Sequence, residues 1–363
     1  MKQNFRTTIL LAAFIIAASA GGYAQNRKLP TIPQKKNTDS AAPVTKPEQV
    51  RSTPVAKGPD VYVVGDVHTT GDNYAGILWK NGMEQRLTNG NSEAYASSVY
   101  VSGNDVYVAG VNGKVATLWK NGKAQSLSNG NNDVNVTSLF VSGNNVYVAG
   151  SEKNTQGKTV AMLWKNGIAQ SLTNGNNYAE ASSVYVSGND VYAVGNEGSY
   201  PNVVAMLWKN GKAQRLTDGT YNADAYSVYV SGNDVYIAGQ AFSQHHSIAV
   251  LWKNGMEQRF TNGNSDAGAS SVYVSGNDVY VAGYICDAGN KGVATLWKNG
   301  AAQSLINSDY YTSASSVYVS GNDVYVAGSG DYNAATLWKN GKAQILNKTR
   351  KLSDATSVFV KEP

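Results

Sequence analysis

The chain of 363 residues contains 37 glycines, 23 tyrosines and only 8 prolines, and 15% of its residues are charged. This composition favours short strands joined by tight turns. The net charge of +5 is uneven: the first 58 residues hold nine Lys and Arg against two Asp and Glu, whereas the rest holds 21 against 23. A nearly neutral main part argues against nucleic acid as a partner, and the single cysteine, Cys286, excludes an internal disulfide.

Residues 1–24 are predicted to be a secretory signal peptide. Lys2 and Arg6 precede an apolar run at 9–18 that is short for a membrane span, and small residues suited to cleavage lie near Ala24. A retained membrane anchor is the alternative. We expect cleavage, which leaves no transmembrane segment, and export to the periplasm, the cell surface or the extracellular space.

Residues 25–57 are predicted to form a disordered basic linker. The segment is rich in Lys, Pro, Thr and Gln and has no apolar period. Residues 58–363 follow as the folded part.

Residues 58–363 are built from a repeat marked by tryptophan. All seven tryptophans occur in one sequence frame, at spacings of 40, 45, 44, 44, 45 and 41 residues. The repeat at 314–345 contains four strand-like segments: Ser-Val-Tyr-Val, Asp-Val-Tyr-Val-Ala-Gly, Ala-Thr-Leu-Trp-Lys and Lys-Ala-Gln-Ile. Asn340-Gly341 between the last two is a strong hairpin signal. A period of about 40–45 residues with four strands predicts the blade of a β-propeller.

The two ends of the repeat region complement each other. The chain enters at a second segment, 60–65, and finishes on a lone first segment, 357–360. An open array needs capping repeats, whereas a ring can share one sheet between its ends. We therefore predict an all-β, seven-bladed propeller with four-stranded blades, closed by the C-terminal strand pairing into the N-terminal blade.

The segments resemble bacterial secreted β-propeller repeat families with a Ser-Val-Tyr-Val-Ser-Gly-Asn-Asp-Val-Tyr-Val-Ala-Gly core, as at 316–328. The resemblance covers about 300 residues and every repeat. Because the activity of these families is mostly unassigned, it implies architecture and export and supplies no catalytic residues.

The two faces of the predicted disc differ in sequence. One face carries near-identical turns and a lysine in every repeat, which is either a set of solvated turn edges or a shallow basic ring. These lysines are Lys80, Lys120, Lys165, Lys209, Lys253, Lys298 and Lys339. The other face carries the loops of variable length, and binding sites are commonly placed on such loops.

Acidic residues recur on the variable face, four or six positions before the first apolar residue of the first segment. They are Glu93, Asp133, Glu180, Asp224, Asp266 and Asp354. One interpretation is an acidic collar at the channel mouth that holds a cation or a hydroxyl-rich ligand. The other is that these carboxylates accept backbone hydrogen bonds and fix the loops.

Loop tyrosines extend this candidate ligand site, because exposed tyrosines are favoured contact residues. The candidates are Tyr95, Tyr178, Tyr221 and Tyr311. His245, His246 and Cys286 are weak candidates for a metal, although their spacing matches no established motif. We expect no cofactor, with structural calcium as an open alternative. The tryptophans are assigned to blade packing.

The near-symmetry of the repeats favours a non-enzymatic exported binding or scaffold module, including a structural role in the cell envelope. In this interpretation a monomer engages a protein or a glycan through the variable-loop face. The alternative is an envelope-associated, glycan-active enzyme on a propeller scaffold. Such an enzyme needs paired carboxylates in different environments, and most of the acids here are equivalent between repeats.

Overall fold

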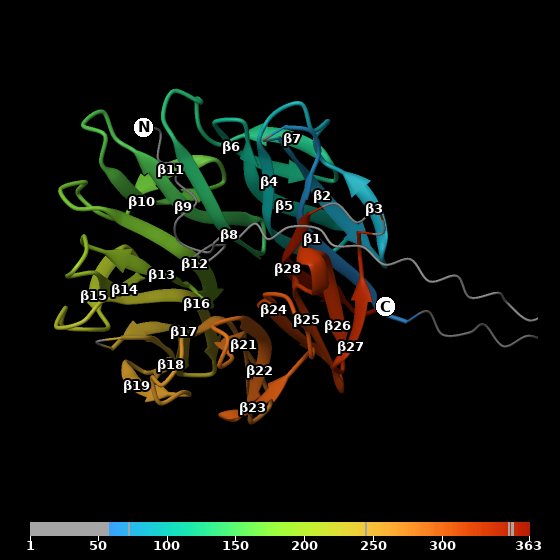
Figure 1. Ribbon diagram of the computed structural model, residues 1–363. Coiled ribbons are helices and arrows are strands. Elements are labelled where there is room, and N and C mark those ends of the chain that lie inside the picture. The colour runs from blue at the N-terminus through green and yellow to red at the C-terminus, as the bar shows by residue number, and fades with distance from the viewer. Residues whose placement is uncertain (1–57, 72, 244, 348, 350–351) are drawn as a thin grey trace, which may run out of the picture. The chain divides into compact units, whose positions relative to one another are not determined.

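The computed structural model describes residues 58–71, 73–243, 245–347, 349 and 352–363. Over these residues the chain forms seven four-stranded antiparallel sheets arranged around one axis (Figure 1), which confirms the predicted propeller. The predicted signal peptide and linker lie outside the described residues. The one helical element among them is the 3-10 turn η1 (Asp331–Asn333), and no helix there has the length and apolar character to cross a membrane.

Each blade contributes one strand to the wall of the central channel. From blade 1 to blade 7 these innermost strands are β28 (Ser353–Lys361), β4 (Ala94–Ser102), β8 (Val134–Ser142), β12 (Ala179–Ser187), β16 (Ala223–Ser231), β20 (Ala267–Ser275) and β24 (Ser313–Ser320). The second strands are β1 (Asp60–His68), β5 (Asp105–Asn112), β9 (Asn145–Lys153), β13 (Asp190–Glu197), β17 (Asp234–Phe242), β21 (Asp278–Cys286) and β25 (Asp323–Ser329).

The tryptophan repeat forms the outer half of each blade. The third strands are β2 (Tyr74–Lys80), β6 (Val115–Lys120), β10 (Thr159–Lys165), β14 (Val204–Lys209), β18 (Ser247–Lys253), β22 (Gly292–Lys298) and β26 (Ala335–Lys339). The outer strands are β3 (Met83–Arg86), β7 (Lys123–Ser126), β11 (Ile168–Ser171), β15 (Lys212–Arg215), β19 (Met256–Arg259), β23 (Ala301–Ser304) and β27 (Lys342–Ile345). As their polar composition predicts, the outer strands are almost fully exposed, and polar side chains protect such edges from pairing with other molecules.

The Asn-Gly hairpins adopt the backbone conformation that their sequence requires. In blade 7, Asn340 and Gly341 have φ values of 51° and 77°, as a two-residue type I′ turn demands. The Asn340 side chain also accepts a hydrogen bond from the backbone N–H of Val324 at 2.8 Å. Each turn is therefore tied to the start of the second strand, which fixes the register of the blade.

The ring closes as predicted, because β28 from the C-terminus pairs with β1 from the N-terminus. Val360, Phe359 and Val358 lie opposite Val61, Tyr62 and Val63 in an antiparallel ladder. In Figure 1 the red C-terminal strand β28 lies beside the blue strand β1. Blade 1 is thus assembled from both ends of the propeller.

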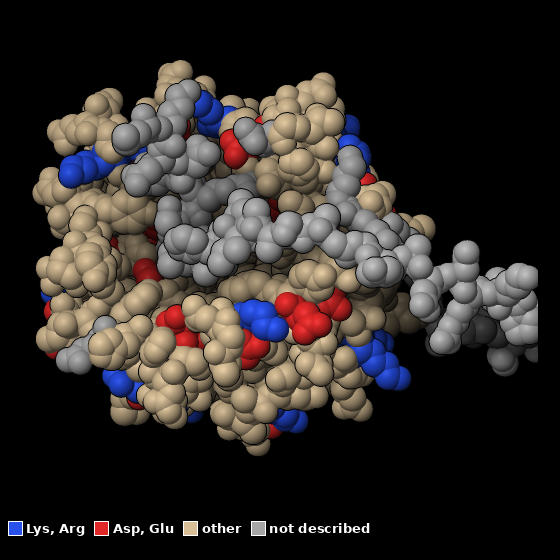
Figure 2. Space-filling model, viewed as in Figure 1, with Lys and Arg blue, Asp and Glu red and all other residues tan. Residues whose placement is uncertain are grey.

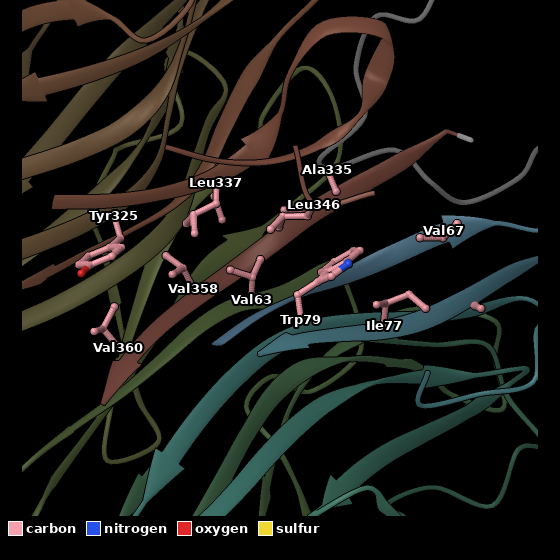
Figure 3. Packing of buried hydrophobic residues seen from close by; sticks show 13 residues of the cluster. Val63, Val67, Ile77, Trp79, Tyr325, Ala335, Leu337, Leu346, Val358 and Val360 are labelled. Atoms are coloured by element: carbon pink, nitrogen blue, oxygen red, sulfur yellow. The ribbon is translucent and has the colours of Figure 1, made fainter. Parts of the chain in front are cut away.

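The hydrophobic core lies between the faces of neighbouring blades. At the closure, Trp79 and Ile77 of blade 1 pack in one buried cluster with Leu337 of blade 7 and with Val358 of β28 (Figure 3). All seven tryptophans are at most 1% exposed, which confirms their assignment to blade packing. Burial of such large apolar side chains is the main stabilising contribution of each interface.

The innermost strands begin earlier than the sequence predicts. β12 starts at Ala179, whereas the predicted segment starts at Ser183, and a β-bulge interrupts the ladder between Ala181 and Ser183. Opposite the bulge, a Cβ atom on Gly195 would lie 1.9 Å from the carbonyl oxygen of Glu180. Only glycine permits this approach, and the added residues place acidic side chains on the channel wall.

Candidate functional site

A ring of seven aromatic side chains narrows the central channel at the level of the innermost strands. Each strand contributes one ring, and neighbouring ring centroids are 4.7–5.0 Å apart. The members are Tyr100, Phe140, Tyr185, Tyr229, Tyr273, Tyr318 and Phe359. Burial raises the pKa of Tyr185 and Tyr273. All seven side chains are half-buried and line the channel at this level.

Asp224 lies on the channel wall beyond this ring, near the start of β16, and is only 9% exposed. It accepts a hydrogen bond from Asn196 Nδ2 at 2.6 Å, and Gln240 Nε2 lies 3.5 Å from its other oxygen. Burial raises the pKa of Asp224; these two hydrogen bonds oppose the rise, and the charge of Glu180 adds to it. The environment therefore favours the protonated carboxyl group.

Glu180 occupies the equivalent position on β12 and is 8% exposed. Its Oε1 lies 3.3 Å from the hydroxyl of Ser151, which belongs to the preceding blade. The half-buried Tyr226 directs its hydroxyl at Asp224 Oδ2, 3.5 Å away. Glu180 and Asp224 therefore interact on neighbouring blades but have different partners. We call Glu180 and Asp224 the channel acid pair.

Asn196 lies opposite Glu180 in the β12–β13 ladder and binds Asp224 of the next blade. The residue is 2% exposed, its amide nitrogen binds Asp224, and its Oδ1 has no hydrogen-bond partner among the described residues. A buried carbonyl oxygen without a donor is costly. The oxygen can accept a hydrogen bond from a hydroxyl group of a ligand or from water.

The other predicted collar residues have different surroundings. Asp354 lies opposite Asp66 in the β28–β1 ladder. Asp133 is exposed and forms ion pairs with Lys153 at 2.8 Å and Lys114 at 3.5 Å.

Two further collar residues are engaged in the loops. Asp266 Oδ1 accepts a hydrogen bond from the backbone N–H of Ser247 at 2.8 Å, and Glu93 accepts one from the Tyr95 hydroxyl. Of the six acids, Glu180 and Asp224 are thus buried on the strands, Asp354 and Asp266 are half-buried, and Glu93 and Asp133 are exposed in the loops. Acidic side chains are visible on both sides of the central region of the propeller in Figure 2.

The candidate tyrosines also lie in separate environments. Tyr221 donates a hydrogen bond at 2.7 Å to Glu257 on the outer strand β19, and burial raises its pKa to about 12. Tyr311 packs against the position of Gly292, where a Cβ would lie 2.5 Å from its ring. Tyr178 is half-buried beside β12, and its carbonyl oxygen binds the N–H of Gly198.

The weak metal candidates form no recognisable ligand set. His245 is exposed, His246 Nδ1 lies 3.5 Å from Asp266 Oδ1, and Cys286 is buried, which raises its thiol pKa to about 11. Across the described ranges, no group of three or more His, Cys, Asp or Glu side chains is arranged to hold a metal ion.

The seven lysines of the opposite face do not form a free basic ring. In six blades the lysine binds an aspartate at the start of the second strand, at 2.6–3.1 Å. The charges therefore compensate one another. Blade 3, with Asn145 at the aspartate position, is the exception.

Several residues of the channel wall were not predicted from the sequence. The second strand of every blade contains a glycine at the same position, and the residue after this glycine differs between the repeats. Ser151, Asn196 and Gln240 occupy this variable position. This variation within an otherwise uniform strand was the available signal. Its meaning depended on the bulge, which places this frame beside the acids of the next blade.

Comparisons with known proteins define the class of the fold. No family model matches the sequence, and no curated protein matches it. Among solved structures, a Mycobacterium tuberculosis puromycin-hydrolyzing peptidase is similar, with a TM-score of 0.54, 10% identity, and coverage of 78% of this chain and 53% of the peptidase. A puromycin hydrolase in complex with PGG gives a TM-score of 0.53 at 9% identity, covering 84% and 57%.

A third structure, Pyrococcus horikoshii acylaminoacyl peptidase, has a TM-score of 0.48 and 11% identity, with coverage of 79% and 52%. This chain spans about half the length of each of these proteins. At such identities the likeness shows the fold alone, which is that of a seven-bladed β-propeller.

The comparisons contradict the expectation of a non-enzymatic binding or scaffold module. Of the three solved structures described above, the two with TM-scores above 0.5 are described as hydrolytic enzymes. The repeat symmetry is also broken at the channel wall, because the channel acid pair and its partners Ser151, Asn196 and Gln240 differ from blade to blade. The enzyme alternative agrees better with both findings.

Proposed function

We propose that the protein is a glycan-active hydrolase whose reaction takes place at the channel acid pair. The observation that carries the proposal is a pair of buried carboxyl groups on neighbouring blades with different partners. Burial raises the pKa of Asp224, and the charge of Glu180 contributes to that rise. Pairs of carboxyl groups in different environments are the means by which most glycosidases combine a proton donor with a base or nucleophile.

The proposed roles follow from these environments. Protonated Asp224 donates its proton to the glycosidic oxygen as the bond to the anomeric carbon breaks. Glu180 supports the attack on that carbon, either by taking a proton from the attacking water or by attacking it directly, in which case water later releases the sugar. Asn196 Oδ1 accepts a hydrogen bond from a sugar hydroxyl beside the acid. Asn196 also holds Asp224 in place.

The proposed activity takes place outside the cytoplasm. We infer a secreted bacterial repeat protein that acts in the envelope or outside the cell, on the basis of the N-terminal sequence and the resemblance of the repeats. The two similar structures described as hydrolases favour bond hydrolysis in general terms. The choice of a glycan rests on the two carboxyl groups.

The test is release of reducing ends from a panel of bacterial envelope polysaccharides by the full chain. Asp224→Asn and Glu180→Gln should each lower the rate by about 100-fold or more, the usual contribution of a general acid or base. Activity should fall as the pH rises through the pKa of Asp224, since the acid must be protonated. Asp278→Asn, on the opposite face, is the matched control and should retain full activity.

Two outcomes would refute the proposal. One is that no polysaccharide of the panel is cleaved by the unmodified protein. The other is cleavage that both channel variants retain, which would place the reaction elsewhere.

A further inference from the structure

The opposite face of the propeller carries one cluster that recurs in six blades. In blade 2, Asp105 Oδ2 binds Lys120 Nζ at 2.7 Å and lies 3.4 Å from the Tyr107 hydroxyl, while Asp105 Oδ1 accepts a hydrogen bond from Asn121 Nδ2 at 2.7 Å. The lysine also lies over the tyrosine ring, at 5.2 Å. One carboxylate therefore serves three donors, which satisfies the cluster internally.

Blade 3 keeps the donors and lacks the carboxylate. Asn145 replaces the aspartate, and its Oδ1 accepts the hydrogen bond from Asn166 Nδ2 at 2.8 Å. The amide nitrogen of Asn145 consequently takes the position of the second carboxylate oxygen. Lys165 still lies over Tyr147, at 5.4 Å. Within the described part of the chain, no carboxylate lies at ion-pair distance from Lys165. Three groups that can donate hydrogen bonds therefore surround a position that no carboxylate occupies.

A cavity adjoins this acceptor-poor place. It has a volume of about 180 Å³ and lies between blades 3 and 4, where Tyr147 and Lys165 share its lining with Gln170, Trp208 and Asn210. Trp208 Nε1 is buried and has no hydrogen-bond partner among the described residues. The lining thus combines aromatic and aliphatic surface with a positive charge at one side, as ligand pockets commonly do.

We propose that blade 3 binds a small carboxylate whose apolar substituent occupies this cavity. The ligand carboxylate takes the place of the missing aspartate and accepts hydrogen bonds from Lys165 Nζ, Asn145 Nδ2 and the Tyr147 hydroxyl. The substituent packs on Trp208 and Leu163, which also line the cavity. This site is independent of the channel acid pair, which lies on the channel wall.

The proposal is tested by titrating the full chain with sodium benzoate and measuring binding by calorimetry and by tryptophan fluorescence. Benzoate should bind at one site, more tightly than acetate, and benzyl alcohol should not bind. Asn145→Asp supplies the internal carboxylate found in the six other blades and should weaken benzoate binding by at least about tenfold, as loss of a charged hydrogen-bonded site predicts. Lys165→Met should do the same.

The matched control is Lys120→Met in blade 2, where the lysine is already paired, and this variant should bind benzoate as the unmodified protein does. Thermal melting shows that the variants are folded. Benzoate binding that Asn145→Asp leaves unchanged would overturn the proposal. Tighter binding of inorganic phosphate than of benzoate would show that the ligand class is wrong.

Discussion

The candidate site is defined by a few residues that differ between repeats, whereas the repeat around them is nearly uniform. Glu180 and Asp224 could be predicted as acids near the channel, since they occur at one frame of the sequence. Their burial could not be predicted, because it depends on the early start of the innermost strands and on the β-bulge. The role of Asn196 could not be predicted either, because its hydrogen-bond partner Asp224 belongs to the next blade.

The raised pKa of Asp224 has a consequence for stability. A buried carboxyl group whose folded pKa exceeds its unfolded value, near 3.9, destabilises the folded protein as the pH rises from the unfolded toward the folded pKa. Asp224→Asn should therefore raise the melting temperature at pH 7 and have little effect at pH 3. Thermal melting at the two pH values measures this. An equal effect at both would mean that the pKa of Asp224 is not raised.

At the scale of the secondary structure, the order of segments alone was enough to predict closure. Seven copies of each segment, with a second segment at one end and a first segment at the other, required β28 to complete blade 1. The bulges and the additional residues at the start of the innermost strands were not predictable, because they reflect contacts with the second strand rather than local sequence preference.

Removal of β28 should open the ring. A chain ending at residue 352 loses Val358 and Val360, which are 4% and 3% exposed, and full burial of such a side chain is worth about 1.5–3 kcal/mol. It also exposes β1 along its whole length. We expect loss of the cooperative thermal transition, with partial recovery on addition of a peptide of residues 353–361. A chain lacking only Glu362 and Pro363 is the control. A cooperative transition in the shorter chain would contradict the role of β28.

At the scale of the whole molecule, the same lysine–aspartate ion pair recurs in six of the seven blades around the disc. Hydrogen bonds from the neighbouring lysine, and next from the turn asparagine, lower the pKa of the aspartate in four blades. These residues are Asp105, Asp190, Asp278 and Asp323. Repetition of a weak, exposed contact makes its pH dependence visible in the whole protein, although each single pair contributes little.

These clusters predict how the propeller responds to acid. Because the folded pKa values lie below the unfolded value near 3.9, their stabilisation is present above pH 4 and is lost as the pH falls through the folded pKa values. The melting temperature should change little between pH 7 and pH 5 and fall below pH 4. High salt should reduce this fall by screening the pairs. Melting curves at low and high ionic strength measure both effects, and a salt-independent acid transition would assign it to other groups.

The ring of seven aromatic side chains has a consequence for the passage of molecules through the central channel. Aromatic side chains line the channel on every blade at one level. A molecule that crosses from one side of the disc to the other through the channel must therefore pass these rings.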